Sequence, residues 1–264
     1  MVAAGPSPVK SKRGNAGDKA NAEVMFAILH NLQRLMLDRK PHIKAYKKAR
    51  KLQGEILGSM MAYYESGKFE RKFDTNGSQR NGTNTKDRKN ILSLDTEFDL
   101  DTNEGEQAFF EFMFYKVAPN MNCITEDFIQ QKRYRKPEKL EFLQSMLDSR
   151  AGLFMVTDVD IGEGYVFVEE VFTGARYKVI DIALSISQNY KNSYFYNRII
   201  TYRGMSFNSG LCMVFAKDDP FITEYIQKEK KDYKPHAELV RFIELHTQFV
   251  NDPKGIKVSI NDVK

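Results

Sequence analysis

The pattern of apolar and polar positions places a sheet between Gly152 and Ala216, with helices on both sides of it. Short runs of β-branched and aromatic residues alternate there with glycine turns at 162–164 and 173–174. Such runs are typical of β-hairpins. With two later runs, bounded by Gly204 and Gly210, they predict about five short antiparallel strands in a small, barrel-like sheet. Residues 165–172 include a run that is apolar on both faces, so we expect both faces to be covered or nearly so.

Apolar residues at helical spacing predict two helices before the sheet. The first begins near Asp18 and is stopped by Pro41, and the second covers about 42–65. The short link between them predicts an antiparallel helical hairpin. After the sheet, Asp218-Asp219-Pro220 is a strong helix start signal, with acids at the N-cap and proline at the first helical position.

The second helix separates its charges from its apolar residues. At 100° per residue, the lysines share one face: Lys44, Lys47, Lys48 and Lys51. The opposite face is apolar and comprises Ala45, Ala49, Leu52, Ile56, Met60 and Tyr63. Residues 39–51 hold seven Lys or Arg and no acid. The pattern fits a solvated helix face, phosphate contacts with nucleic acid, or docking on an acidic surface.

A second basic run follows a predicted short helix at 125–131. It contains Arg133 and Arg135 on either side of Tyr134. These two arginines are secondary candidates for contact with nucleic acid or a partner, and a solvated loop is the plainer interpretation.

An acidic stretch between Ile91 and Glu106 offers the only candidate metal ligands. Asp95 and Glu97 follow an apolar run, as carboxylates of a two-metal nuclease do. The same stretch resembles part of a calcium loop, but Leu100 stands where the loop needs glycine. A solvated acidic loop is the alternative. No nucleotide-binding, zinc-protease or serine-hydrolase motif is present, so we expect no cofactor.

Charge is distributed unevenly along the chain. Residues 1–90 carry +11, from 19 Lys and Arg against 8 Asp and Glu, and residues 91–264 carry −6, from 21 against 27. A basic arm on an acidic body favours an anionic partner, or docking of the arm on the body. Two cysteines, the absence of a secretory signal and the absence of a long apolar run predict a cytoplasmic protein that does not contact a membrane.

The sheet region also carries a family resemblance. The segments SRAGLFMVTDV, GEGYVFVEEVFTGARYKVID and RIITYRGMSFNSGLCMVF are similar to the β region of an uncharacterised bacterial group whose members often carry an appended SEC-C zinc motif. Upstream, EGEQAFFEFMFYKVAPNMNCITEDFIQ resembles the Phe-rich helix that precedes this region in the group. The resemblance covers roughly 105–216 and implies a fold but no activity. The chain lacks the Cys and His cluster of the zinc motif, so zinc binding does not carry over.

These observations predict an α+β protein. Its expected parts are a tail at 1–17, a basic helical hairpin at 18–66, a flexible linker at 67–90, a body at 91–251 with the sheet at about 152–216, and a tail at 252–264. The expected function is that of a bacterial or phage accessory or regulatory protein, which binds nucleic acid or an acidic partner without catalysis. The alternatives are a metal-dependent nuclease and a subunit of a larger protein assembly.

Overall fold

The computed structural model describes residues 31–69, 103–116, 121–131, 136–186, 190–231, 233–234 and 238–251. The helices are α2 (Pro41–Glu65), α4 (Asn103–Phe114), α5 (Ile124–Gln130), α6 (Pro137–Leu147), α7 (Ile182–Ile186), α8 (Pro220–Lys231) and α9 (Glu238–Asn251). The strands are β1 (Arg150–Asp160), β2 (Tyr165–Glu170), β3 (Arg176–Ile180), β4 (Tyr194–Tyr202) and β5 (Met205–Phe215). The predicted α+β class and the position of the sheet are confirmed.

The five strands form one sheet that closes on itself in the order β1-β2-β3-β5-β4. Neighbouring strands pair antiparallel except β3 and β5, which pair in parallel through Val179 and Ser206. The prediction of a purely antiparallel sheet was therefore wrong at this seam. Five strands closed in this order, with α7 between the third and the fourth, have the topology of an OB-fold.

The strands turn one row of side chains inward and leave another partly exposed. The inward row packs into one cluster with α7: Phe154, Val156, Val166, Val168, Val179, Leu184, Phe195, Ile199, Cys212 and Val214. Tyr165 and Phe167 alternate with the buried valines of β2 and remain half-buried. The outer face of β2 is therefore covered only in part, as expected for a strand whose two faces are both covered or nearly so.

The turn between β4 and β5 is shorter than predicted. It consists of Arg203 and Gly204, which have φ angles of 50° and 75°. Two residues with positive φ form the turn type whose twist matches a β-hairpin. Gly210, expected in that turn, instead lies inside β5 with φ 145°. There the pairing with β4 shifts between Asn197 and Ile199, which marks a bulge.

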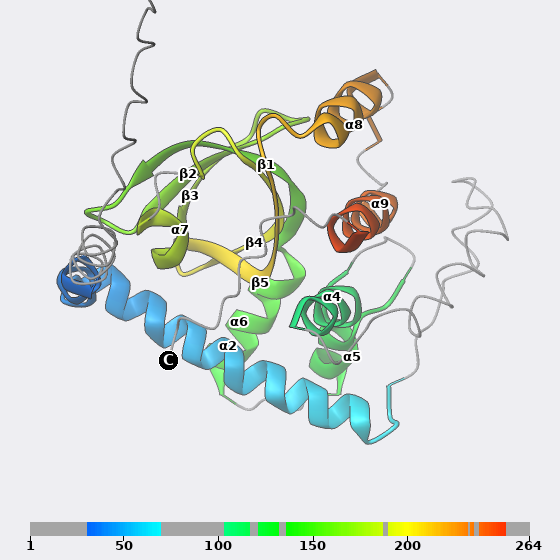
Figure 1. Ribbon diagram of the computed structural model, residues 1–264. Coiled ribbons are helices and arrows are strands. Elements are labelled where there is room, and N and C mark those ends of the chain that lie inside the picture. Colours follow the sequence, from blue (N-terminus) through cyan, green and yellow to red (C-terminus); the bar gives the residue numbers. More distant parts are fainter. Residues whose placement is uncertain are drawn as a thin grey trace, which may run out of the picture.

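Helix α2 crosses beneath the sheet, and α4, α5, α8 and α9 gather at one side of it (Figure 1). The buried residues of α2 join the main core together with residues of the sheet, α4 and α6. The buried face comprises Ile43, Tyr46, Ala49, Gln53, Ile56, Met60 and Tyr63. The predicted face was thus partly wrong: Ala45 is exposed, and Gln53 lies among the apolar residues.

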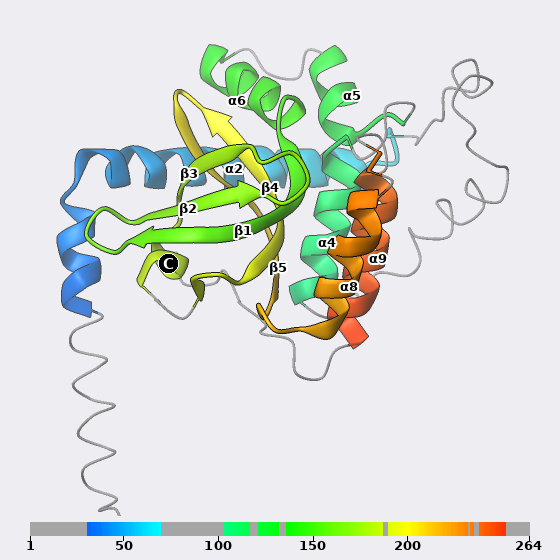
Figure 2. The same cartoon turned by 90° about the horizontal axis from the view of Figure 1, so that it is seen from above.

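The helical segment that precedes α2, described for residues 31–38, does not fold back along it. In Figure 2 the segment leaves the start of α2 at a steep angle. The two pieces meet at a bend, where the backbone N–H of Lys40 donates to the carbonyl of Leu37. The described residues therefore do not form the expected antiparallel hairpin.

Candidate functional site

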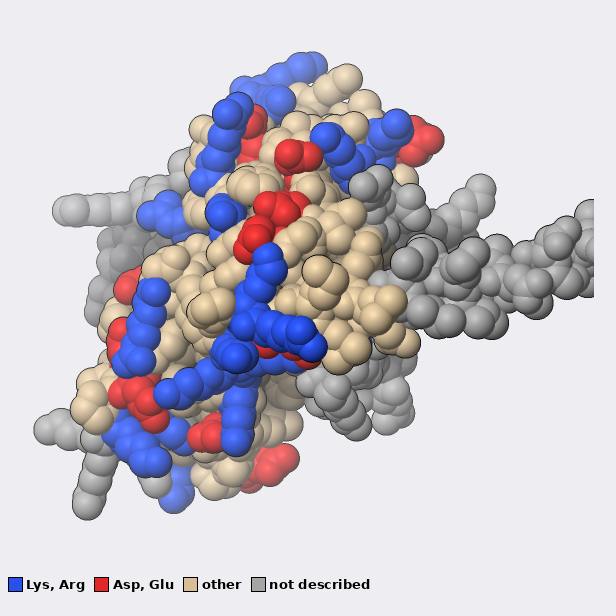
Figure 3. Space-filling model, turned by 90° about the vertical axis from the view of Figure 1, so that its left-hand side faces the viewer, with Lys and Arg blue, Asp and Glu red and all other residues tan. Residues whose placement is uncertain are grey.

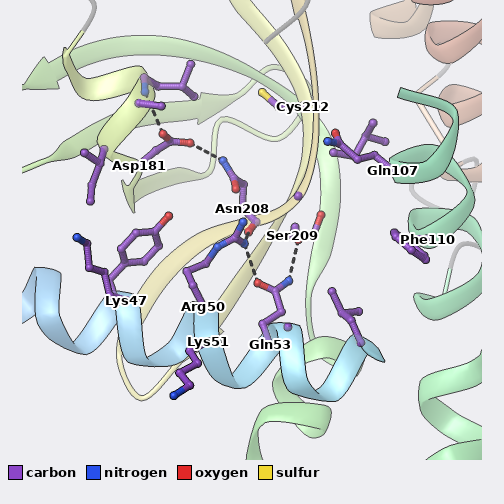
Figure 4. A pocket seen from close by; sticks show the side chains of 18 of the residues that line it. Lys47, Arg50, Lys51, Gln53, Gln107, Phe110, Asp181, Asn208, Ser209 and Cys212 are labelled. Atoms are coloured by element: carbon purple, nitrogen blue, oxygen red, sulfur yellow. Dashed lines mark hydrogen bonds between the residues drawn. The ribbon is translucent and has the colours of Figure 1, made fainter. Parts of the chain in front are cut away.

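A cavity of about 750 Å³ lies between α2, α4, α7 and β5. Figure 4 shows its two principal walls: Arg50 and Gln53 project from α2, and Asp181 and Asn208 face them from the sheet side. Its size falls within the range of about 300–1,000 Å³ that is usual for small-molecule sites. Because charged and amide groups line its interior, the cavity is a candidate binding site.

The bulge in β5 positions the side of the cavity that α2 forms. A bulge removes residues from the ladder and leaves backbone carbonyls that need other donors. The guanidinium Nη1 of Arg50 donates to the carbonyl of Asn208 at 3.0 Å, and the amide of Gln53 donates to the carbonyl of Ser209 at 2.7 Å. Arg50 also donates to the side-chain oxygen of Gln53 at 2.7 Å. The two side chains thus fix α2 against β5 and hold the guanidinium at the cavity wall.

Asp181 supplies the opposite wall. It follows β3 directly and caps α7, because its Oδ1 accepts a hydrogen bond from the backbone N–H of Leu184 at 2.9 Å. Its Oδ2 accepts one from the amide of Asn208 at 2.5 Å. Burial raises the pKa of this carboxyl, and the hydrogen bonds oppose that rise. Asp181 therefore enters the cavity as a buried acid whose charge is stabilised by hydrogen bonds.

The raised pKa of Asp181 predicts a pH-dependent stability difference. The folded protein retains the proton more strongly than the unfolded chain, whose aspartates titrate near pH 4. Wild-type stability should therefore fall, relative to Asp181→Asn, as the pH rises from about 4 through the raised pKa. Urea unfolding of both proteins from pH 4 to 7 measures the difference. Curves that stay parallel over this range would contradict the assignment.

Asp158 supplies a control of opposite sign. Lys191 lies 3.0 Å from it and lowers its pKa. The wild-type protein should therefore gain stability relative to Asp158→Asn as the pH rises from acid values. Both curves are measured under the same conditions, so a general effect of pH on folding cannot produce the two opposite slopes.

Arg50 and Asp181 both face the cavity but do not pair with each other. Among the described residues, no carboxylate lies within 4.0 Å of the Arg50 guanidinium, and no cation lies within that distance of Asp181. Asn208 stands between them, since its backbone carbonyl accepts from Arg50 and its side chain donates to Asp181. Arg50 therefore acts on Asp181 only across a longer distance, and this half-buried arginine keeps N–H groups available for an anion.

A buried ionic network adjoins the cavity through Glu111, which is one of the lining residues. The guanidinium of Arg198, on β4, binds the carboxylates of Glu111 and Glu238. Its side chain is 2% exposed, as is that of Glu111. The second oxygen of Glu111 accepts from the Ser209 hydroxyl at 3.0 Å. The cavity is therefore connected by hydrogen bonds to the centre of the protein.

The four predicted lysines divide between two surfaces. Lys44 and Lys48 are exposed on α2 and do not line the cavity, whereas Lys47 and Lys51 do. Lys47 is paired with Asp38 at 2.8 Å. Figure 3 shows the side of the molecule at which α2 begins, where Lys and Arg side chains gather with acidic side chains among them. The predicted basic face thus exists, and it includes one side of the cavity.

Other sequence candidates lie outside the described residues, namely Arg133, Arg135, Asp95 and Glu97. Across the described ranges, no group of three or more His, Cys, Asp or Glu residues is placed to hold a metal ion. Cys123 and Cys212 are buried free thiols, as predicted, and burial raises the pKa of Cys123 to about 11. No helix in the described part of the chain is long and apolar enough to cross a membrane.

The cavity residues Arg50, Gln53, Asp181 and Asn208 were not predicted. The sequence held one signal for them. Gln53 lies within the apolar stripe of α2, where a buried amide needs a partner. Asp181 and Asn208 are 27 residues apart, and only the parallel β3–β5 seam brings their side chains together.

The fold and the cavity define an α+β protein with a closed sheet and a pocket that combines apolar walls with a few charged and amide groups. Residues 40–259 match the model of a family of unknown function, DUF7986, and the chain belongs to that family. The predicted likeness to an uncharacterised group is confirmed in this form, and the match does not show the predicted association with a SEC-C motif. No curated protein and no solved structure matches the chain.

Proposed function

We propose that this protein binds nucleic acid in an accessory or regulatory role, with the exposed cations of α2 contacting phosphates. One observation carries the proposal: Lys44, Lys48 and Lys51 are exposed on one side of α2, and no described carboxylate pairs with any of them. The three lysines span about 10 Å along the helix. Cations without partners at this spacing match a row of backbone phosphates, which bind Lys and Arg without regard to base sequence.

The outer face of β2 and β3 favours a single strand as the ligand. Lys178 lies over the ring of Tyr165, 3.7 Å from its centroid, and the half-buried Phe167 is next on that face. Tyr165 also stacks on His42, at the start of α2. Aromatic rings beside cations serve as stacking platforms for unpaired bases. OB-folds bind oligonucleotides on this same pair of strands, which supports the proposal by analogy of fold.

Most acids around this aromatic face already have cationic partners. Glu163 pairs with Lys40, Glu169 with Arg176, and Asp158 with Lys191. Their negative charge is therefore largely compensated. The face adjoins α2 through the contact between His42 and Tyr165, so one strand can reach both the aromatic side chains and the lysines.

Fluorescence anisotropy tests the proposal with labelled single strands of about twelve nucleotides and a matched duplex. We expect the single strands to bind at about 50 mM salt and to weaken steeply by about 200 mM. Labelled poly-glutamate is the control for an acidic protein partner. Equal binding of poly-glutamate would assign the lysines to such a partner, and no binding of any strand at low salt would refute the proposal.

A further inference from the structure

We infer that the cavity between α2, α7 and β5 is a nucleotide-binding site, which holds either a free nucleotide or one nucleotide of a bound strand. The choice of a nucleotide rests on the proposed function, whereas the cavity itself stands on independent geometry. Three features of its lining define the ligand: a cationic side, a buried hydrogen-bond acceptor and apolar walls.

The cationic side fits a phosphate. Arg50 uses only its Nη1 atom in the contacts with Gln53 and Asn208. Its remaining N–H groups are available, and a guanidinium binds two phosphate oxygens at once. Lys51 lies one residue further along α2, lines the same cavity, and has no described partner. Arg50 supplies a positive charge to the wall that faces Asp181 and Asn208, whereas the exposed Lys51 extends from α2 away from them and supplies a second charge at the rim (Figure 4).

The opposite wall fits the hydrogen-bonding edge of a base. The Asp181 carboxylate is 8% exposed and accepts from Leu184 and Asn208. A carboxylate has about four lone-pair positions, so it can accept further donors. Exocyclic amino and ring N–H groups of a base are such donors and lie side by side along one planar edge, whereas inorganic phosphate offers only its one or two hydroxyl groups at neutral pH. The cavity therefore distinguishes a nucleotide from a simple anion.

The walls between these two ends are aromatic and aliphatic. Tyr46 and Phe110 line the cavity, as do Leu57, Ile182 and Leu211. Burial raises the pKa of Tyr46 to about 12, so its hydroxyl remains a neutral donor. A flat heteroaromatic ring can pack against such walls. An amino acid would satisfy the charged ends but would leave most of about 750 Å³ empty.

Isothermal titration calorimetry on the full chain tests the inference. The probes are AMP, GMP, CMP and UMP, the four matching nucleosides, and inorganic phosphate. We expect at least one monophosphate to bind at a 1:1 ratio with Kd below about 1 mM, and its nucleoside to bind at least about tenfold more weakly. A failure of all four monophosphates overturns the inference, as does inorganic phosphate that binds equally well.

Two glycines of α2 provide matched variants. Gly54 and Gly58 are both exposed, and a Cβ at either position would meet no atom within 4 Å. Only Gly54 lines the cavity. Gly54→Glu places a carboxylate beside Arg50 and Lys51, and should weaken monophosphate binding at least about tenfold. Gly58→Glu makes the same change one turn away and should leave binding unchanged. Equal effects of the two variants overturn the inference.

The two possible sources of the nucleotide separate in a competition experiment. If the site holds part of a strand, a 5′-phosphorylated tetranucleotide should displace the bound monophosphate, and Gly54→Glu should weaken both ligands. If the site holds a free nucleotide, the tetranucleotide should not compete. Monophosphate binding that persists while single strands fail to bind would refute the proposed function and leave the cavity site intact.

Discussion

Replacing Arg198 by Met should destabilise the protein by about 3–5 kcal/mol, the largest stability effect we expect from a single substitution. The guanidinium holds two carboxylates, those of Glu111 and Glu238, and both arginine and Glu111 are 2% exposed. Without it, the buried carboxylate of Glu111 and the partly buried carboxylate of Glu238 would lie close together with no cation between them. Urea unfolding measures the loss, which corresponds to a Tm lower by roughly 10 °C.

Arg203 is the matched control for Arg198. It lies five residues further along the same hairpin and also binds a glutamate, Glu141, but its side chain is 51% exposed. Solvent screens an exposed ion pair and leaves it with little net effect, so Arg203→Met should change stability little. A loss of less than 1 kcal/mol in Arg198→Met would contradict the role assigned to the network.

Low pH should reduce the loss of stability caused by Arg198→Met. Burial already raises the pKa of Glu238, and Arg198 opposes that rise. Without the guanidinium the pKa of this carboxyl should rise further, so the variant loses stability as the pH increases through that higher value. The difference between variant and wild type should therefore shrink towards pH 4, where the Glu238 carboxyl becomes protonated more readily.

The strand positions followed from local signals, but the closure of the sheet did not. Glycine turns and β-branched runs predicted the strands because those signals act within a few residues. The parallel seam between Val179 and Ser206 joins segments 27 residues apart, and no local pattern encodes it. Similarly, the sequence predicts Gly210 at a turn, because a glycine between strands has the same signature in a turn and in a bulge.

The candidate site was predictable only on its outer side. The lysine face of α2 follows from helical periodicity, since solvent-facing charges need no partners. The cavity depends instead on how α2 rotates against the sheet. The predicted apolar stripe included Ala45 and omitted Gln53, an error in rotation that placed the buried amide outside the core. The predicted rotation of α2 also places Arg50 among the surface cations, although its guanidinium binds the carbonyl of Asn208 beside the β5 bulge.

Charge reversal of Lys44 and Lys48 should produce the largest loss of nucleic-acid affinity, on the order of 100-fold at low salt. Both lysines are exposed and lie outside the cavity, so their replacement by Glu leaves the nucleotide site intact. Loss of two phosphate contacts should also reduce the slope of log affinity against log salt by about 1.4 for a single strand. Anisotropy titrations at several salt concentrations give both quantities.

The control for the lysine reversal is Lys230→Glu with Lys231→Glu. These lysines are exposed in the last turn of α8, away from the start of α2 in Figure 1. The control changes the net charge by the same amount as the reversal on α2. If nucleic acid contacts α2, the control should retain most of its affinity, because exposed charges beyond a Debye length of about 10 Å are largely screened. Equal losses in the two variants would mean that overall charge governs binding. A loss confined to the α2 variant, with a shallower salt slope, would identify Lys44 and Lys48 as phosphate contacts.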